Sequence, residues 1–143
     1  MTQDEQFATS EKIKAMLHEY FHRAYTLGDA TVIDELLAPD ILTYGLSAEP
    51  TRTRQDFKNW YTPFRSSFSD VNCQMTHCVV EGEWVSCRVH FTGTHTGKGL
   101  GPPPTGNKVI LTAMVLARVR NGQVVEGYNE FNQHSLLQQI GAL

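Results

Sequence analysis

The sequence lacks the features that would direct it to a membrane or to a nucleic acid. No apolar run approaches the roughly 20 residues that a membrane helix needs, and the polar start MTQDEQFATSEK has no apolar core of a secretory signal. The 12 Lys and Arg residues are scattered rather than gathered in a stripe, and the formal net charge is -3. We therefore expect a cytoplasmic protein that binds neither a membrane nor DNA or RNA.

Cysteine is scarce as well. Cys73, Cys78 and Cys87 are odd in number, lie in strand-like sequence and have no CxxC spacing. These features argue against a disulfide framework and against a zinc knuckle. We expect buried, reduced thiols without redox chemistry.

The rest of the composition suits one domain. The chain has 143 residues, of which 41% are hydrophobic, and this is enough to bury one core. We expect a flexible N-terminus at residues 1–9 and a single domain at residues 10–143.

Apolar residues recur at helical spacing in the first half of the chain. A first helix is predicted from Ser10 to about Leu27, and a short second helix ends at Pro39. A brief strand over 41–44 precedes a third helix, which Pro63 should kink or divide.

From Val71 onward the apolar spacing alternates, which predicts strands. The expected order is a strand from Val71, a turn at 81–83, a strand at 84–96, a Gly/Pro-rich loop at 97–106, a strand at 108–119, an Asn-Gly turn at 121–122, a strand at 123–131 and a helix at 135–140. Helices followed by an antiparallel meander predict an α+β fold, in which the helices cover one face of a curved sheet.

The Gly/Pro-rich loop carries the most specific motif. Gly93-Thr-His-Thr-Gly97, Leu100-Gly101 and Pro103-Pro-Thr-Gly106 resemble the signature loop of the SnoaL-like polyketide cyclases. The resemblance extends over nearly the whole chain from Ser10, through similar sequence at Tyr61–Arg65, Glu130-Phe131 and Leu137–Gly141. It implies the cone-shaped fold shared with nuclear transport factor two and ketosteroid isomerase, in which sheet and helices enclose an apolar pocket.

The same resemblance implies a reaction from which this chain departs. Characterised cyclases of the family use a pocket aspartate on the last strand for an intramolecular aldol closure, without metal or cofactor. Asn129 stands at the aligned position, and Val115 and Ala113 replace a histidine and a glutamine on the preceding strand. An amide cannot take a proton from carbon near neutral pH, although it can hydrogen-bond to a developing oxyanion.

The long central strand supplies the predicted catalytic groups. Arg88 and His90 share one face, and resemblance to related epoxide hydrolases, which carry an Arg-x-Asp pair here, places that face in the pocket. We expect His90 to be the general base, since its unperturbed pKa of about 6.5 suits proton transfer. Arg88 would stabilise negative charge and Asn129 would orient an oxygen. The alternative is a His90 on the outer face or hydrogen-bonded in the core.

Further side chains are candidates for substrate binding. His77 lies where family members often carry an acid, but it can equally be an ordinary strand histidine near a turn. The expected pocket wall also contains Tyr44, Trp60, Phe64, Val115 and Phe131. Aromatic residues at helical spacing are equally typical of plain core.

One metal-site pattern has the wrong context. His18-Glu19-Tyr20-Phe21-His22 matches H-E-x-x-H, but the apolar face of the helix leaves both histidines toward solvent and no third ligand follows. We expect no zinc and no cofactor.

The leading hypothesis is a cofactor-independent cyclase, isomerase or hydrolase that performs proton transfer on an apolar, oxygenated small molecule such as a polyketide or terpenoid. Alternatives are a non-catalytic small-molecule-binding module that kept the cone and lost the aspartate, or a partner-binding scaffold. An inward His90 or His77 would favour the enzyme, and an all-apolar cavity would favour binding. Outward apolar residues, predicted to be Trp84, Val89 and Phe91, indicate a homodimer.

Overall fold

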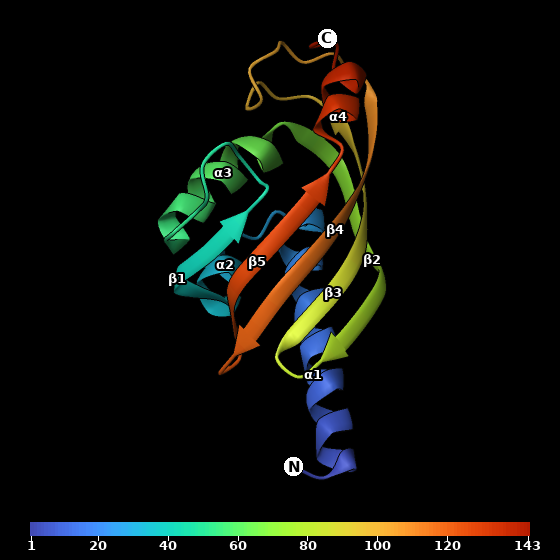
Figure 1. The fold of residues 1–143 in the computed structure, drawn as a ribbon. Coiled ribbons are helices and arrows are strands. Elements are labelled where there is room, and N and C mark those ends of the chain that lie inside the picture. Colours follow the sequence, from blue (N-terminus) through green and yellow to red (C-terminus); the bar gives the residue numbers. More distant parts are fainter.

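Five strands form one curved sheet, and three helical segments from the first half of the chain pack against its inner face. The computed structural model describes residues 1–143 (Figure 1). The helices are α1 (Gln3–Phe21), the π-helical turn η1 (His22–Thr26), α2 (Thr31–Leu36), α3 (Arg54–Ser66) and α4 (Gln133–Gln139), and the strands are β1 (Leu37–Tyr44), β2 (Phe68–Glu81), β3 (Trp84–His95), β4 (Lys108–Arg120) and β5 (Gln123–Phe131). The three segments on the inner face are α1 with η1, α2 and α3. The predicted α+β class is confirmed. No helix combines the length and the hydropathy that a bilayer crossing requires.

The sheet has the strand order β1-β5-β4-β3-β2. Strands β2 to β5 form the predicted antiparallel meander, and β1 adds to β5 in parallel. Asn121 and Gly122 have φ values of 51° and 74°, as a two-residue type I′ hairpin turn requires. Glu81 pairs with Trp84 across the other turn, and Arg120 pairs with Gln123 across this one, so both predicted hairpins are confirmed.

The structure differs from the predicted start of the first helix, and it excludes a division of the third helix at Pro63. Helix α1 begins at Gln3, well before Ser10, because Thr2 and Glu5 form a capping box that satisfies backbone N–H groups at the helix start. The apolar stripe used for the prediction begins only at Ile13. Pro63 lies inside α3 without dividing it. Pro63 has no N–H to donate to the carbonyl of Asn59. Asn59 is exposed, so this carbonyl is not left unpaired in the core.

Alternation along β3 defines the inner and outer faces of the sheet. Val85, Cys87, Val89 and Phe91 are all buried, whereas the residues between them are partly exposed. The prediction that Val89 and Phe91 point outward is therefore wrong. Trp84 does lie on the outer face, where the Arg118 guanidinium lies 5.5 Å from the centre of its ring.

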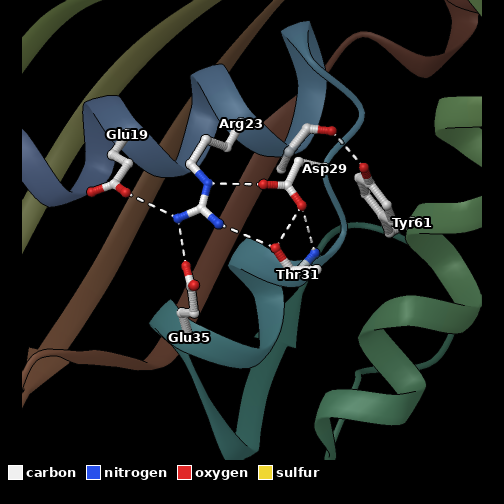
Figure 2. Close-up of polar contacts among 7 residues, drawn as sticks. Glu19, Arg23, Asp29, Thr31, Glu35 and Tyr61 are labelled. Atoms are coloured by element: carbon white, nitrogen blue, oxygen red, sulfur yellow. Dashed lines mark hydrogen bonds and ion pairs between the residues drawn. The ribbon is translucent and has the colours of Figure 1, made fainter.

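Arg23 joins the end of the first helical segment to α2 (Figure 2). Its guanidinium pairs with the carboxylates of Glu19, Asp29 and Glu35. Asp29 also accepts hydrogen bonds from the backbone N–H and the hydroxyl of Thr31, at 3.0 and 2.6 Å. The bonds from Thr31, and then the one from Arg23, lower the pKa of the Asp29 carboxyl.

We predict that Asp29→Asn lowers the melting temperature at pH 7 by about 3 °C. The Asp29 pKa is lower in the folded than in the unfolded chain, so its stabilising effect is complete above the ordinary value of about 3.9 and is lost as the pH falls through the folded value. The difference between wild type and variant should therefore shrink as the pH falls below the ordinary pKa. Thermal melts over this pH range measure it, and Glu49→Gln, whose carboxylate makes no hydrogen bond, is the control. A difference independent of pH would contradict the prediction.

Candidate functional site

A cavity lies between the helices and the inner face of the sheet. It is open to solvent on one side and has about 560 Å³ of empty space when its mouth is included. Twelve of its 14 lining residues are hydrophobic. The lining consists of Phe21, Tyr25, Leu46, Trp60, Phe64, Cys73, Val89, Phe91, Leu111, Thr112, Ala113, Val115, Asn129 and Phe131. A second, smaller chamber shares five of these residues and extends toward Tyr20 and Thr43.

The helix side of the cavity is aromatic. Trp60 stacks on Phe64 with ring centres 5.0 Å apart, and Phe64 contacts Phe91 of β3 at 5.6 Å. Both helix positions, which were predicted as pocket wall, line this cavity. Because the rings come from both α3 and β3, they fix the distance between helix and sheet.

Two residues of α3 hold η1 in place and thereby position Tyr25. The Tyr61 hydroxyl donates to the carbonyl of Ala24 at 2.5 Å (Figure 2). The Arg65 guanidinium donates to the carbonyls of Tyr25 and Thr26 at 2.7 and 3.3 Å. These bonds satisfy the carbonyls at the end of η1, which have no helical partner. Tyr25 is thus fixed at the cavity by contacts far away in sequence.

Tyr25 and Tyr20 form a buried hydroxyl pair. Their oxygens are 3.2 Å apart. Burial raises the pKa of both phenols far above the ordinary value, so both stay protonated and act as hydrogen-bonding groups rather than bases. One hydrogen forms the bond between them, which leaves one O–H donor without a partner in the chain. Burial likewise raises the pKa of the Cys73 thiol to about 12.

The sheet side of the cavity carries Asn129. Val115 pairs with Asn129 and Ala113 with Phe131, so all four share the inner face, as predicted. The Asn129 amide donates through Nδ2 to the carbonyl of Tyr44 at 3.1 Å, and no group of the chain donates to its Oδ1. This bond fixes the orientation of the amide. The cavity therefore contains one unused acceptor on the sheet, and the Tyr25 hydroxyl is an unused donor on the helix wall when Tyr20 supplies the hydrogen of their mutual bond.

The predicted catalytic pair Arg88 and His90 does not reach the cavity. Both lie on the outer face of β3, and Val89 lies in the wall instead. Arg88 donates to the Thr76 hydroxyl at 3.2 Å. The prediction was wrong by one residue because it followed the likeness to epoxide hydrolases. The chain's own alternation of apolar and polar residues over 85–92 indicates the correct face.

His77 and Tyr44 also lie outside the cavity, contrary to prediction. The pairing of β2 with β3 shifts between Met75 and His77, which leaves His77 exposed. Tyr44 is 40% exposed and stacks on Tyr128 across the outer face, with ring centres 5.3 Å apart. An irregularity in strand pairing has no local signature in the sequence. Beyond it, the alternation of side chains no longer predicts which face of the sheet a residue occupies.

The histidines of the H-E-x-x-H pattern, His18 and His22, are both exposed. They border a polar groove between α1 and β2. No group of three His, Cys, Asp or Glu side chains lies in position to hold a metal ion. The expectation that the protein binds no zinc stays a prediction.

The Gly/Pro-rich loop at 96–107 packs closely on the end of α3. A Cβ atom on Gly97 or Gly99 would lie about 2 Å from a carbonyl oxygen of α3, which explains why these positions are glycine. His95 is fully buried at the base of the loop, and its Nδ1 accepts from the backbone N–H of Thr105 at 3.2 Å. Leu100 then borders a depression beside Trp60, at the outer side of the aromatic wall. The loop is thus held firmly beside the cavity wall.

Comparisons with known proteins agree with this architecture. The family model described as SnoaL-like polyketide cyclase matches residues 15–140. IdmH from Streptomyces antibioticus, a proposed polyketide cyclase, is 29% identical, with 92% of this chain and 97% of that chain covered and a TM-score of 0.72. AclR from Streptomyces galilaeus, a proposed hydroxylase, is 25% identical, with 94% and 98% covered and a TM-score of 0.80.

A protein from Catenulispora acidiphila with a ketosteroid isomerase-like fold is 16% identical, with 86% of this chain and 90% of that chain covered and a TM-score of 0.70. This likeness confirms the fold that the signature loop implied. No curated protein matches the chain at a significant level.

We predict that Ala113→Phe fills the cavity and weakens binding of the apolar dye 8-anilinonaphthalene-1-sulfonate by at least about tenfold, because the new ring occupies the space between sheet and helices. Fluorescence titration measures the affinity. Ala15→Phe, the same change on the exposed side of α1, is the control and should leave the affinity unchanged. Equal binding by both variants would show that the dye does not enter the cavity.

Proposed function

Because the chain belongs to the SnoaL-like polyketide cyclase family, we propose that it is a cofactor-independent cyclase that folds an apolar, oxygenated substrate of polyketide type inside its cavity. One observation carries the proposal. The cavity combines aromatic walls with neutral hydrogen-bonding groups, and none of its lining residues bears a carboxylate or an imidazole.

The aromatic walls would promote ring closure by position. A flexible chain that enters a confined apolar space is held in folded conformations, and its reacting ends then meet at a high effective concentration. Stacked rings such as Trp60 and Phe64 favour flat, conjugated ligand segments. This contribution needs no titratable side chain.

Neutral polar groups would then act on the substrate oxygens. The free O–H of the Tyr20/Tyr25 pair can donate to a substrate carbonyl, and this bond strengthens as negative charge develops on the oxygen. The Asn129 Oδ1 can accept from a substrate hydroxyl. Any proton that leaves carbon would pass to water or to the substrate's own oxygens, because neither phenol is ionised at neutral pH.

The second candidate function is a small-molecule-binding module without catalysis. The substitution of an amide for the family aspartate favours it, since the cavity holds no group that could serve as a base. Such a module would bind the same ligands through the same contacts. Conversion of the bound molecule separates the two functions.

We predict that the protein converts an acyclic poly-β-ketone thioester to a cyclic product, followed by liquid chromatography with mass spectrometry. Tyr25→Phe should lower the initial rate by roughly tenfold to a hundredfold, because Tyr25 carries the only hydroxyl of the pair that lines the cavity and could donate to the developing oxyanion. Tyr128→Phe is the matched control, since that hydroxyl bonds to Glu126 on the outer face. Asn129→Asp should introduce a base and change the pH profile of the rate.

One outcome would contradict the cyclase, and another would contradict the catalytic groups proposed for it. Binding of the thioester without conversion would favour the binding module. A large loss of rate in His90→Ala, whose side chain lies outside the cavity, would show that the proton-transfer assignment made from sequence was correct after all.

We also propose a homodimer formed through the outer face of the sheet. One row of paired residues crosses all five strands there, and four of its five members are apolar or aromatic and exposed: Val79, Ser86, Leu116, Tyr128 and Tyr44. Exposed Ile110 and Met114 extend the patch along β4. The helices bury only the inner face, so a second copy is the simplest cover for the outer one.

We predict a dimer by light scattering at micromolar concentration, and a monomer for Leu116→Lys, because a buried lysine at the centre of the interface has no partner. Leu27→Lys replaces a leucine on the helix side that is even more exposed than Leu116, and it should leave the dimer intact. A monomeric wild-type protein would contradict this proposal without affecting the proposed reaction.

A further inference from the structure

Two of the three cysteines face each other across neighbouring strands. Cys78 of β2 pairs directly with Cys87 of β3, so their side chains share one face of the sheet. The Cys87 thiol donates to the Cys78 sulfur, with Sγ atoms 3.6 Å apart. All three cysteines are free thiols in the structure.

The position of this pair fits the geometry of a disulfide. Directly opposite residues in an antiparallel pair have Cα atoms about 4.5 or 5.5 Å apart, and disulfides span Cα distances of about 4.4–6.8 Å. Rotation of the side chains can therefore bring the sulfurs to bonding distance without moving the strands. Cysteine spacing along the sequence does not show this pair, because the register of the hairpin creates it.

We propose that Cys78 and Cys87 are a reversible oxidation site that forms a cross-strand disulfide with hydroperoxides. The three thiols differ in their exposure to solvent. Cys78 is partly exposed, whereas Cys87 is 1% exposed and Cys73 is 6% exposed. The expectation of three buried thiols is therefore wrong for Cys78, and peroxide meets the Cys78 thiolate first.

The reaction balances with one peroxide for each disulfide. The Cys78 thiolate attacks a peroxide oxygen, the O–O bond breaks, and Cys78 becomes a sulfenic acid; hydrogen peroxide releases hydroxide and an organic hydroperoxide releases alkoxide. The Cys87 sulfur then attacks the Cys78 sulfur, the S–O bond breaks, and the hydroxyl leaves as water with the Cys87 proton. Burial raises the pKa of the Cys87 thiol, which slows this attack, but the fixed 3.6 Å separation favours it.

The new bond would join β2 to β3 beside the cavity wall. Cys87 lies between Val85 and Val89 on the inner face of β3 and opposite Val115 on β4. Val89 and Val115 both line the cavity. Oxidation would therefore fix the pairing of β2 with β3 at Cys87, two residues from Val89 of the cavity wall. The oxidation itself does not depend on the proposed cyclase function.

Intact-mass spectrometry after treatment with a small excess of hydrogen peroxide tests the proposal. We expect a loss of about 2 Da per chain, which dithiothreitol reverses. Cleavage after Glu81 and Glu83 separates Cys78 from Cys87, so the disulfide should hold the two fragments together. The melting temperature should rise by about 3–8 °C on oxidation, because the bond restricts the unfolded chain.

Single variants assign the bond. Cys73→Ser should still lose about 2 Da, whereas Cys78→Ser and Cys87→Ser should not. A gain of about 32 Da at Cys78 without a cross-link, a linked pair of chains, or a cross-link that survives Cys78→Ser would each overturn the proposal.

Discussion

The alternation of side chains along β3 is the constraint on which the site depends. Helices bury one face of the sheet, so each residue of this strand is either a core residue or an outer one, and a shift of one position exchanges the two sets. Val89 and Phe91 close the cavity only because Arg88 and His90 point away from it. The same alternation, continued across the paired strands, forms the apolar outer row and brings Cys78 to Cys87.

Contacts between distant parts of the chain position the helix side of the cavity. Tyr61 and Arg65 of α3 satisfy backbone carbonyls of η1, and this holds Tyr25 beside Tyr20. Arg23 joins the same segment to α2 (Figure 2). Because polar groups meet the backbone needs of a π-helical turn, the aromatic side chains are left to form the wall.

The chain has the fold of its family, and its cavity has an amide at position 129 and no ionised residue in its lining. A carboxylate at position 129 would carry a desolvation cost in so apolar a space, and its pKa would rise toward neutrality, as a general acid/base requires. The amide of Asn129 avoids this cost and gives up proton transfer. The proposed reaction therefore depends on confinement and on neutral hydrogen bonds, with Tyr25 and Asn129 on opposite walls.

The sequence by itself determined the order of helices and strands, both hairpin turns and the inward face of β5, because apolar periodicity and turn residues are local signals. It also determined the family, through the loop that follows Gly93. Only the tertiary structure decided the register between strands: the irregularity beside His77, the parallel addition of β1 that brings Tyr44 to the outer face, and the meeting of Cys78 with Cys87. Register is fixed by hydrogen bonds and packing between segments far apart in the chain, so no single segment carries the information that sets it.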